Sequence, residues 1–259
     1  MADPLSILRE KARQASSRAH APYSRQATGT ALLLSDGHWV AGVRTESVSY
    51  SLVIPALVAA CATAVSLGRA DAVAVALSRA IRPEDISYMR ATPFGSLEQN
   101  GVDTFIRSEP LPAPECRLDP LLECSEAISP ETAIPLTRSV ARRAFAPDSQ
   151  FPVGCIVRTQ QGELIPGVNV EHIDWSRSLC AERSALAAAI GHGAGGITDV
   201  YVSCLNDPDG SPCGACRQLL VELAPMATIW LDRGPAPPER TTPALLLPGA
   251  FRGKGLGGP

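Results

Sequence analysis

Arg143-Ala-Phe-Ala-Pro-Asp-Ser149 repeats a segment that lies 125 residues earlier in the chain, Arg18-Ala-His-Ala-Pro-Tyr-Ser24. The two copies stay in phase without a gap over residues 18–68 and 143–193, where about 16 of 51 positions are identical. Self-similarity at a fixed spacing indicates a duplicated structural unit. The chain is therefore predicted to contain two copies of one domain. The identities include three pairs of glycines: Gly29 and Gly154, Gly37 and Gly162, and Gly42 and Gly167.

Length and composition agree with two folded domains. The 259 residues leave room for one large domain or two ordinary ones. A net charge of -3 gives no basic surface for nucleic acid or an anionic membrane. The charged N-terminal segment, residues 1–18, lacks the apolar region of a signal peptide, so the expected compartment is the cytoplasm. Thiols stay reduced there, and grouped cysteines more often bind metal than form disulfides.

The stretch Ser47–Gly68 contains 22 residues without a charge, which is long enough to span a bilayer. Its counterpart in the second copy, however, carries Glu182 and Arg183, which favours a helix buried in a globular domain. Pro55 suits the first turn of such a helix, where its missing N–H group costs nothing. We therefore expect a domain helix and no membrane span.

Each copy is predicted to be an α/β sandwich with helices packed on a mixed sheet, because helical and strand patterns alternate along it. The predicted division is a copy without catalytic residues (1–92), a Pro-, Glu- and Ser-rich linker (93–130) and a catalytic copy (131–259), whose tail is expected to be mobile. The expected helices of the second copy are Glu131–Ala144, Leu179–Ile190 and Cys213–Leu223, and the expected strands are Val153–Thr159, Glu163–Asn169, Asp199–Cys204 and Thr228–Leu231.

Three cysteines of the second copy have the spacing of a zinc site. Cys213 and Cys216 stand at i and i+3 of a helix start, which presents both sulfurs to one point, and Cys180 begins another helix. Three protein ligands leave a fourth position open, as in catalytic zinc sites. A redox pair of cysteines would not need the third cysteine. A purely structural zinc site, as in a scaffold protein, would need a fourth protein ligand. Catalytic zinc, one ion per chain, is the favoured interpretation.

Glu182 follows Cys180 by two residues, so its carboxylate can reach the metal site without binding the metal. That is the placement of a proton shuttle, although an acid at a helix start can also serve only the helix dipole. Arg183 is placed to offset the negative charge of three thiolates. The first copy has Pro55 and Leu57 where the second has Cys180 and Glu182, so we expect the first copy to lack chemistry.

The order Cys180-Ala-Glu182 followed by Pro212-Cys-Gly-Ala-Cys216 closely resembles the cytidine deaminase family. The resemblance implies two tandem cytidine-deaminase-like domains, each a three-layer αβα sandwich. It also implies that Phe151 stacks on the base, that Asn169 and Glu171 bind the ribose hydroxyls, and that Ala181 and Ser211 bind the base edge. The C-terminal ring of Phe251 would reach a neighbouring active site.

The implied activity is hydrolytic deamination of cytidine or deoxycytidine to uridine or deoxyuridine and ammonia, in pyrimidine salvage. The resemblance also implies a homodimer. The first copy of each chain would take the place of a second subunit, so that two chains supply the four domains of a tetrameric enzyme. The segment His172-Ile-Asp-Trp175 and Asp148 depart from the family pattern, and the catalytic copy stands second, whereas two-domain members usually place it first. These departures leave open a modified cytosine nucleoside as the substrate. A polynucleotide-editing enzyme is disfavoured, because the chain is acidic and only 5% aromatic.

Overall fold

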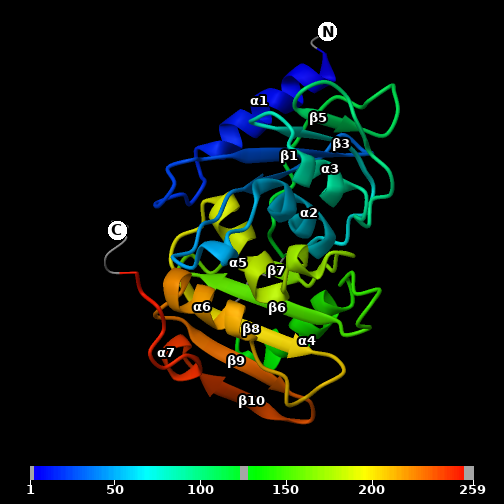
Figure 1. Cartoon of the computed structure of the whole chain (residues 1–259). Helices are drawn as coiled ribbons and strands as arrows, with labels where there is room; N and C mark the ends of the chain where they lie inside the picture. The colour runs from blue at the N-terminus through cyan, green and yellow to red at the C-terminus, as the bar shows by residue number, and fades with distance from the viewer. Residues whose placement is uncertain (1–2, 123–127, 254–259) are drawn as a thin grey trace.

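The computed structural model describes residues 3–122 and 128–253, which form two five-stranded sheets (Figure 1). The first sheet contains, in spatial order, β2 (Trp39–Val43), β1 (Gly29–Leu34), β3 (Ala72–Leu77), β5 (Thr104–Ile106) and β4 (Glu98–Gln99). The second contains β7 (Leu164–Val168), β6 (Val153–Thr159), β8 (Ile197–Cys204), β9 (Thr228–Arg233) and β10 (Ala236–Thr241). The helices are α1 (Pro4–Ser16), α2 (Ala56–Ser66), α3 (Pro83–Met89), α4 (Pro130–Ala141), α5 (Ala181–His192), α6 (Gly214–Leu223) and α7 (Pro243–Leu246), with short 3-10 turns at Tyr50–Leu52 and Trp175–Arg177.

The two sheets have the same order of strands, so the predicted duplication is confirmed at the level of topology. They differ in the direction of the fourth strand. In the first sheet β5 runs antiparallel to β3, whereas in the second sheet β9 runs parallel to β8. Parallel neighbours require a crossover, which α6 supplies in the second copy.

Two glycines of the second copy allow its helices to pack closely against its sheet. A Cβ atom on Gly167 would lie 2.3 Å from the carbonyl oxygen of Ala181, so only glycine lets α5 pack this closely on β7. Gly154 has the same relation to Thr137 of α4, at 2.6 Å. Gly167 pairs with Cys155, the neighbour of Gly154, and adjacent strand residues face opposite sides of a sheet. Helices α4 and α5 therefore cover opposite faces, and the predicted αβα sandwich is confirmed.

Helices α2 and α5 lie next to each other in the middle of the molecule, between the two sheets (Figure 1). Every residue of α2 is buried, because this helix packs on its own sheet and also against α5 and β7. The Ser66 hydroxyl accepts a hydrogen bond from the Val168 amide at 3.1 Å, which joins the copies directly. The uncharged stretch is thus the helix of a shared core. None of the helices in the described residues is long and apolar enough to cross a membrane.

The segment predicted as a linker is partly structured. Its residues 98–106 form β4 and β5, which complete the first sheet, so the first copy extends beyond residue 92 in this structure. The sequence pattern also missed β10 and α7, and it began α5 two residues early, at Leu179. Cys124 of the linker and most of the tail expected to be mobile lie outside the described residues. The remaining domain boundaries stay a prediction.

Candidate active site

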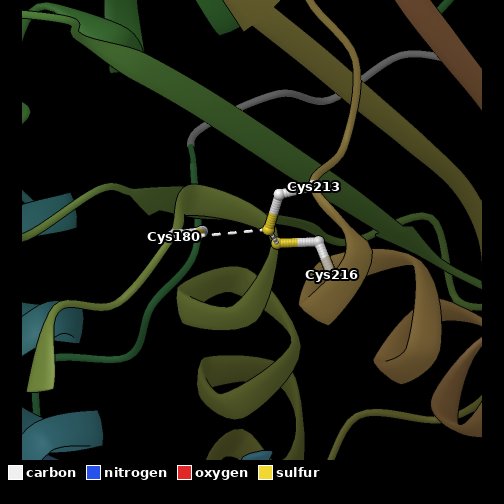
Figure 2. Close-up of side chains that lie close together, drawn as sticks. All are labelled: Cys180, Cys213 and Cys216. Atoms are coloured by element: carbon white, nitrogen blue, oxygen red, sulfur yellow. Dashed lines mark hydrogen bonds between the residues drawn. The ribbon is translucent and has the colours of Figure 1, made fainter. Parts of the chain in front are cut away.

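The three predicted metal ligands lie together at the starts of two helices. Cys180 is the residue before α5, Cys213 is the residue before α6, and Cys216 follows in the first turn of α6. The Sγ atom of Cys213 lies 3.8 Å from that of Cys180 and 3.5 Å from that of Cys216 (Figure 2). Within the described part of the chain this is the group of metal-binding side chains whose ligand atoms all lie within 4.8 Å of one another.

The cluster fits a zinc ion. Three sulfurs of a tetrahedral zinc site, each about 2.3 Å from the metal, lie roughly 3.8 Å apart, close to the spacing found here. Hydrogen bonding with Cys180 and Cys216 lowers the pKa of Cys213, and backbone N–H groups at the start of α6 act in the same direction. The Cys213 sulfur is therefore already stabilised as a thiolate, which is the form that binds metal.

Glu182 lies beside this cluster, in the first turn of α5. Its side chain is buried, with 4% of the residue exposed. Burial raises the pKa of Glu182 to about 7, and the nearby Cys213 sulfur acts in the same direction. A carboxyl group with this pKa both accepts and donates a proton near neutral pH, which is what a proton shuttle requires.

The cluster and Glu182 open into one cavity of about 340 Å³. The predicted residues Phe151, Ala181 and Ser211 contribute to its wall. Cys204, at the end of β8, also lines the cavity, and no motif in the sequence singled it out. The side chains around the cavity are those of Ser149, Phe151, Val153, Asn169, Glu171, Cys180, Ala181, Glu182, Cys204, Ser211, Cys213 and Cys216.

Asn169 and Glu171 face this cavity, but the backbone also binds their side chains. The Asn169 amide donates to the carbonyl oxygen of Phe151 at 3.1 Å and accepts from the Val153 N–H at 2.8 Å. The Glu171 carboxylate accepts hydrogen bonds from the Asp148 amide, at 3.0 Å, and from the amide and hydroxyl of Ser149. Both side chains thus fix the loop that carries Phe151 as well as lining the cavity.

Two predicted site residues lie elsewhere. Arg183 donates a hydrogen bond to the carbonyl oxygen of Leu52 in the first copy, at 3.2 Å. Its side chain lines a different cavity. Phe251 is 56% exposed, and its ring is absent from the wall of the catalytic cavity as far as the described residues show. Its carbonyl oxygen accepts a hydrogen bond from Gln218 at 2.7 Å.

The segment that departs from the family pattern lies beside the first copy. His172 is buried and stacks on Tyr88, with ring centroids 5.1 Å apart. Ile173 and Trp175 are exposed, by 82% and 67%, and neither lines the cavity within the part of the chain described. None of the side chains of this segment therefore contributes to the described wall of the cavity.

Comparison with known proteins matches both copies. A model of the cytidine and deoxycytidylate deaminase zinc-binding region matches residues 127–231, and a second model of that description matches residues 2–82. The cytidine deaminase of Sporosarcina psychrophila is 34% identical over 122 residues, which are 47% of this chain and 90% of that protein. The chain belongs to the cytidine deaminase family. The cytidine deaminase of Halalkalibacterium halodurans is 36% identical over 109 residues, 42% of this chain and 83% of that protein.

A cytidine deaminase structure from Burkholderia pseudomallei is 31% identical, with a TM-score of 0.46, and covers 48% of this chain and all of that one. Membership of the cytidine deaminase family confirms the predicted resemblance and the class of hydrolytic deaminases. Zinc is the metal of the matched region, and the three clustered cysteines are its candidate ligands in this chain. The first copy matches as well, although Pro55 stands where the second has Cys180.

Proposed function

We propose that this protein deaminates cytidine or deoxycytidine, with water as the second reactant, to uridine or deoxyuridine and ammonia, as a step of pyrimidine salvage. The observation that carries the proposal is the placement of Glu182, buried in the same cavity as the three clustered sulfurs. A carboxyl group that shuttles protons next to a metal site is the arrangement that hydrolytic deamination of cytosine requires. The family to which the chain belongs supports the same reaction.

Cys180, Cys213 and Cys216 would hold the zinc ion, which supplies Lewis acidity that makes water a better nucleophile. Glu182 accepts a proton from the water that adds to C4 of the base and transfers a proton to N3. Glu182 then takes the proton of the new C4 hydroxyl and transfers it to the amino group, which leaves as ammonia while the C4 carbonyl forms. One water is consumed and one ammonia is released, and the carboxylate is restored.

The other residues of the cavity bind and orient the nucleoside in this proposal. The Phe151 ring stacks on the base, and the Ala181 backbone and Ser211 bind its polar edge. Asn169 and Glu171 bind the ribose hydroxyls through donor and acceptor positions that their bonds to the backbone leave free. The same bonds hold both side chains in place before substrate arrives.

A modified cytosine nucleoside is the second candidate substrate. The departures at His172–Trp175 motivated it, but the exposed Ile173 and Trp175 are absent from the described wall of the cavity. They would bear on the substrate only through a neighbouring chain. Cytidine and deoxycytidine therefore remain the first choice.

We also propose that two chains form a homodimer that imitates four domains. Tyr50 and Trp175 stand at corresponding positions of the two copies and are 90% and 67% exposed, which is unusual for large rings. Phe251 is exposed near the end of the described chain and would reach the neighbour's site in such a dimer. We place the protein in the cytoplasm, where a site made of three thiolates stays reduced.

Zinc content per chain, measured together with ammonia release from cytidine, tests the proposed function. We expect one zinc per chain and turnover that Glu182→Gln reduces by at least 100-fold without loss of zinc. A panel of cytidine, deoxycytidine and modified cytosine nucleosides decides the substrate. Glu182→Gln protein with full activity would overturn the role of this residue, and two zinc ions per chain would overturn the assignment of one catalytic copy.

A further inference from the structure

The first copy retains a cavity at the place where the second copy has its active site. This second cavity has a volume of about 320 Å³, close to the 340 Å³ of the catalytic one. Pro55, Ala56 and Leu57 line it at the start of α2, as Cys180, Ala181 and Glu182 line the catalytic cavity at the start of α5. The first copy therefore has a space of nucleoside size without the zinc ligands.

None of the metal ligands of the second copy is kept at the corresponding positions around this cavity. Arg82 stands directly before α3, as Cys213 stands directly before α6, and Asp85 occupies the position that corresponds to Cys216. Arg79, which aligns with Cys204, forms a two-point ion pair with Asp85 at 2.6 and 2.9 Å. The described wall thus offers no thiol for a metal, and an arginine–carboxylate pair stands there instead.

Two of the arginines on the wall remain available to an anion. Arg44, Arg79 and Arg177 already have carboxylate partners within 3.0 Å. Arg82, whose side chain is 51% exposed, has Glu84 only at 3.9 Å.

Arg183 reaches the wall from α5, and its Nε atom is buried without a hydrogen-bond partner among the described residues. A buried donor left in this way costs about 1–3 kcal/mol, which a ligand acceptor would recover.

We propose that the second cavity binds a nucleoside monophosphate, with its phosphate on Arg82 and Arg183. Guanidinium groups bind phosphate oxygens through paired N–H donors, and the start of α2 adds backbone dipoles of the same sign. The volume leaves room for the nucleoside part, since the catalytic cavity of equal size is the one proposed to hold a nucleoside. This binding does not depend on the deaminase reaction, so its test is separate from that of the proposed function.

Calorimetric titration of the zinc-loaded protein with UMP, uridine and inorganic phosphate tests the proposal, since none of the three can be deaminated. We expect UMP to bind more tightly than inorganic phosphate and to remain bound when uridine saturates the catalytic cavity. Arg82→Gln is expected to weaken UMP binding by at least about 10-fold, the loss of one charged hydrogen bond, and to leave uridine binding and the deaminase rate unchanged.

Three results would overturn the proposal. The first is the absence of UMP binding at millimolar concentration, and the second is UMP that uridine displaces and that Arg82→Gln does not affect. The third is equal affinity for UMP and inorganic phosphate, which would show that the anion alone is recognised. Arg82 suits the substitution because its side chain is half exposed and its one ion pair is long, so the variant is expected to fold.

Discussion

Arg183 on α5 donates a hydrogen bond to the carbonyl oxygen of Leu52, 3.2 Å away in the other copy, although it directly follows Glu182 in the sequence. Successive residues of a helix point in different directions, so one turn of α5 serves two cavities. Glu182 faces the clustered sulfurs, and Arg183 faces the first copy. Its position in the sequence predicted that this arginine offsets the charge of the thiolates, whereas its described contact joins the copies.

Arg183→Met tests which of the two roles matters. We expect the variant to lose about 1–3 kcal/mol of unfolding free energy, because the hydrogen bond to Leu52 is lost, while zinc content stays at one per chain. Urea denaturation followed by fluorescence and metal analysis measures both quantities. Normal stability combined with loss of zinc would instead place the function of Arg183 at the thiolates.

Removal of the metal should expose reactive thiols. A chelator that takes zinc from the protein is expected to abolish deamination and to make Cys213 react rapidly with a thiol reagent, since Cys213 is exposed and its pKa is lowered by its neighbours. Cys116→Ser is the matched control, because Cys116 is exposed but lies outside the cluster. Rapid reaction of Cys213 before chelation, in zinc-loaded protein, would contradict the assignment of Cys213 as a ligand.

Gly167→Ala is expected to disrupt the site by displacing helix α5 from β7. The added Cβ would meet backbone atoms of Ala181 and Ala185 at 2.3 and 2.4 Å, so α5 must move away from β7. We expect a loss of about 1–3 kcal/mol in stability and a weaker zinc site, because α5 positions Cys180 and Glu182. Thermal unfolding and zinc content are the measurements.

Gly162→Asn is the control for this substitution. Gly162 has a φ angle of +86° and nothing within 4 Å of an added Cβ, and asparagine tolerates that backbone conformation. We expect its zinc content to be normal. Equal effects of both substitutions would show that loss of any glycine, and not the contact with α5, is responsible.

The ionised Glu46 carboxylate is expected to stabilise the folded protein, and this contribution is lost in acid. Burial opposes its ionisation, but hydrogen bonds from Ser24, Arg44 and Tyr23 outweigh this and lower the pKa of Glu46 from 4.5 to about 2. The unfolded chain therefore takes up the proton at a higher pH than the folded protein. The contribution is complete above about pH 5, declines as the pH falls through 4.5 and is gone near pH 2, and it amounts to about 1–3 kcal/mol.

Urea titrations of the wild type and of Glu46→Gln at pH 7, 4 and 3 measure this contribution. The difference in unfolding free energy between the two proteins should shrink steadily as the pH falls. A difference that stays constant from pH 7 to pH 3 would mean that the Glu46 carboxylate contributes nothing through its charge.

The sequence predicted those parts of the fold that local pattern and repetition determine. Strand β6 was expected at Val153–Thr159 and is found there, because a short apolar run precedes a clear turn at Gly162. Strand β10 was missed because Ala236-Pro-Pro-Glu239 contains two prolines, which a strand tolerates only at the edge of a sheet, where β10 lies. The direction of β5 could not be predicted, since strand pairing depends on contacts distant in sequence.

The site was predictable where spacing alone brings residues together. Cys213 and Cys216 are one helical turn apart, and Cys180 and Glu182 share a helix start, so each of these pairs needed little tertiary information. The meeting of the two helix starts was predicted because a catalytic zinc ion takes three protein ligands. The direction of Arg183 depends on the first copy, and the place of Cys204 depends on the register between β6 and β8. Neither relation leaves a signal in one sequence.

The direction of the fourth strand also bears on the history of the duplication. Because β9 runs parallel to β8, the second copy needs a long crossover, and the ten-residue helix α6 that provides it carries two cysteines. In the first copy β5 runs the other way, and α3 has seven residues. Cysteines introduced by substitution at Pro55, Arg82 and Asp85 would therefore stand on a differently connected backbone. Three point mutations alone are therefore not expected to build a zinc site in this half.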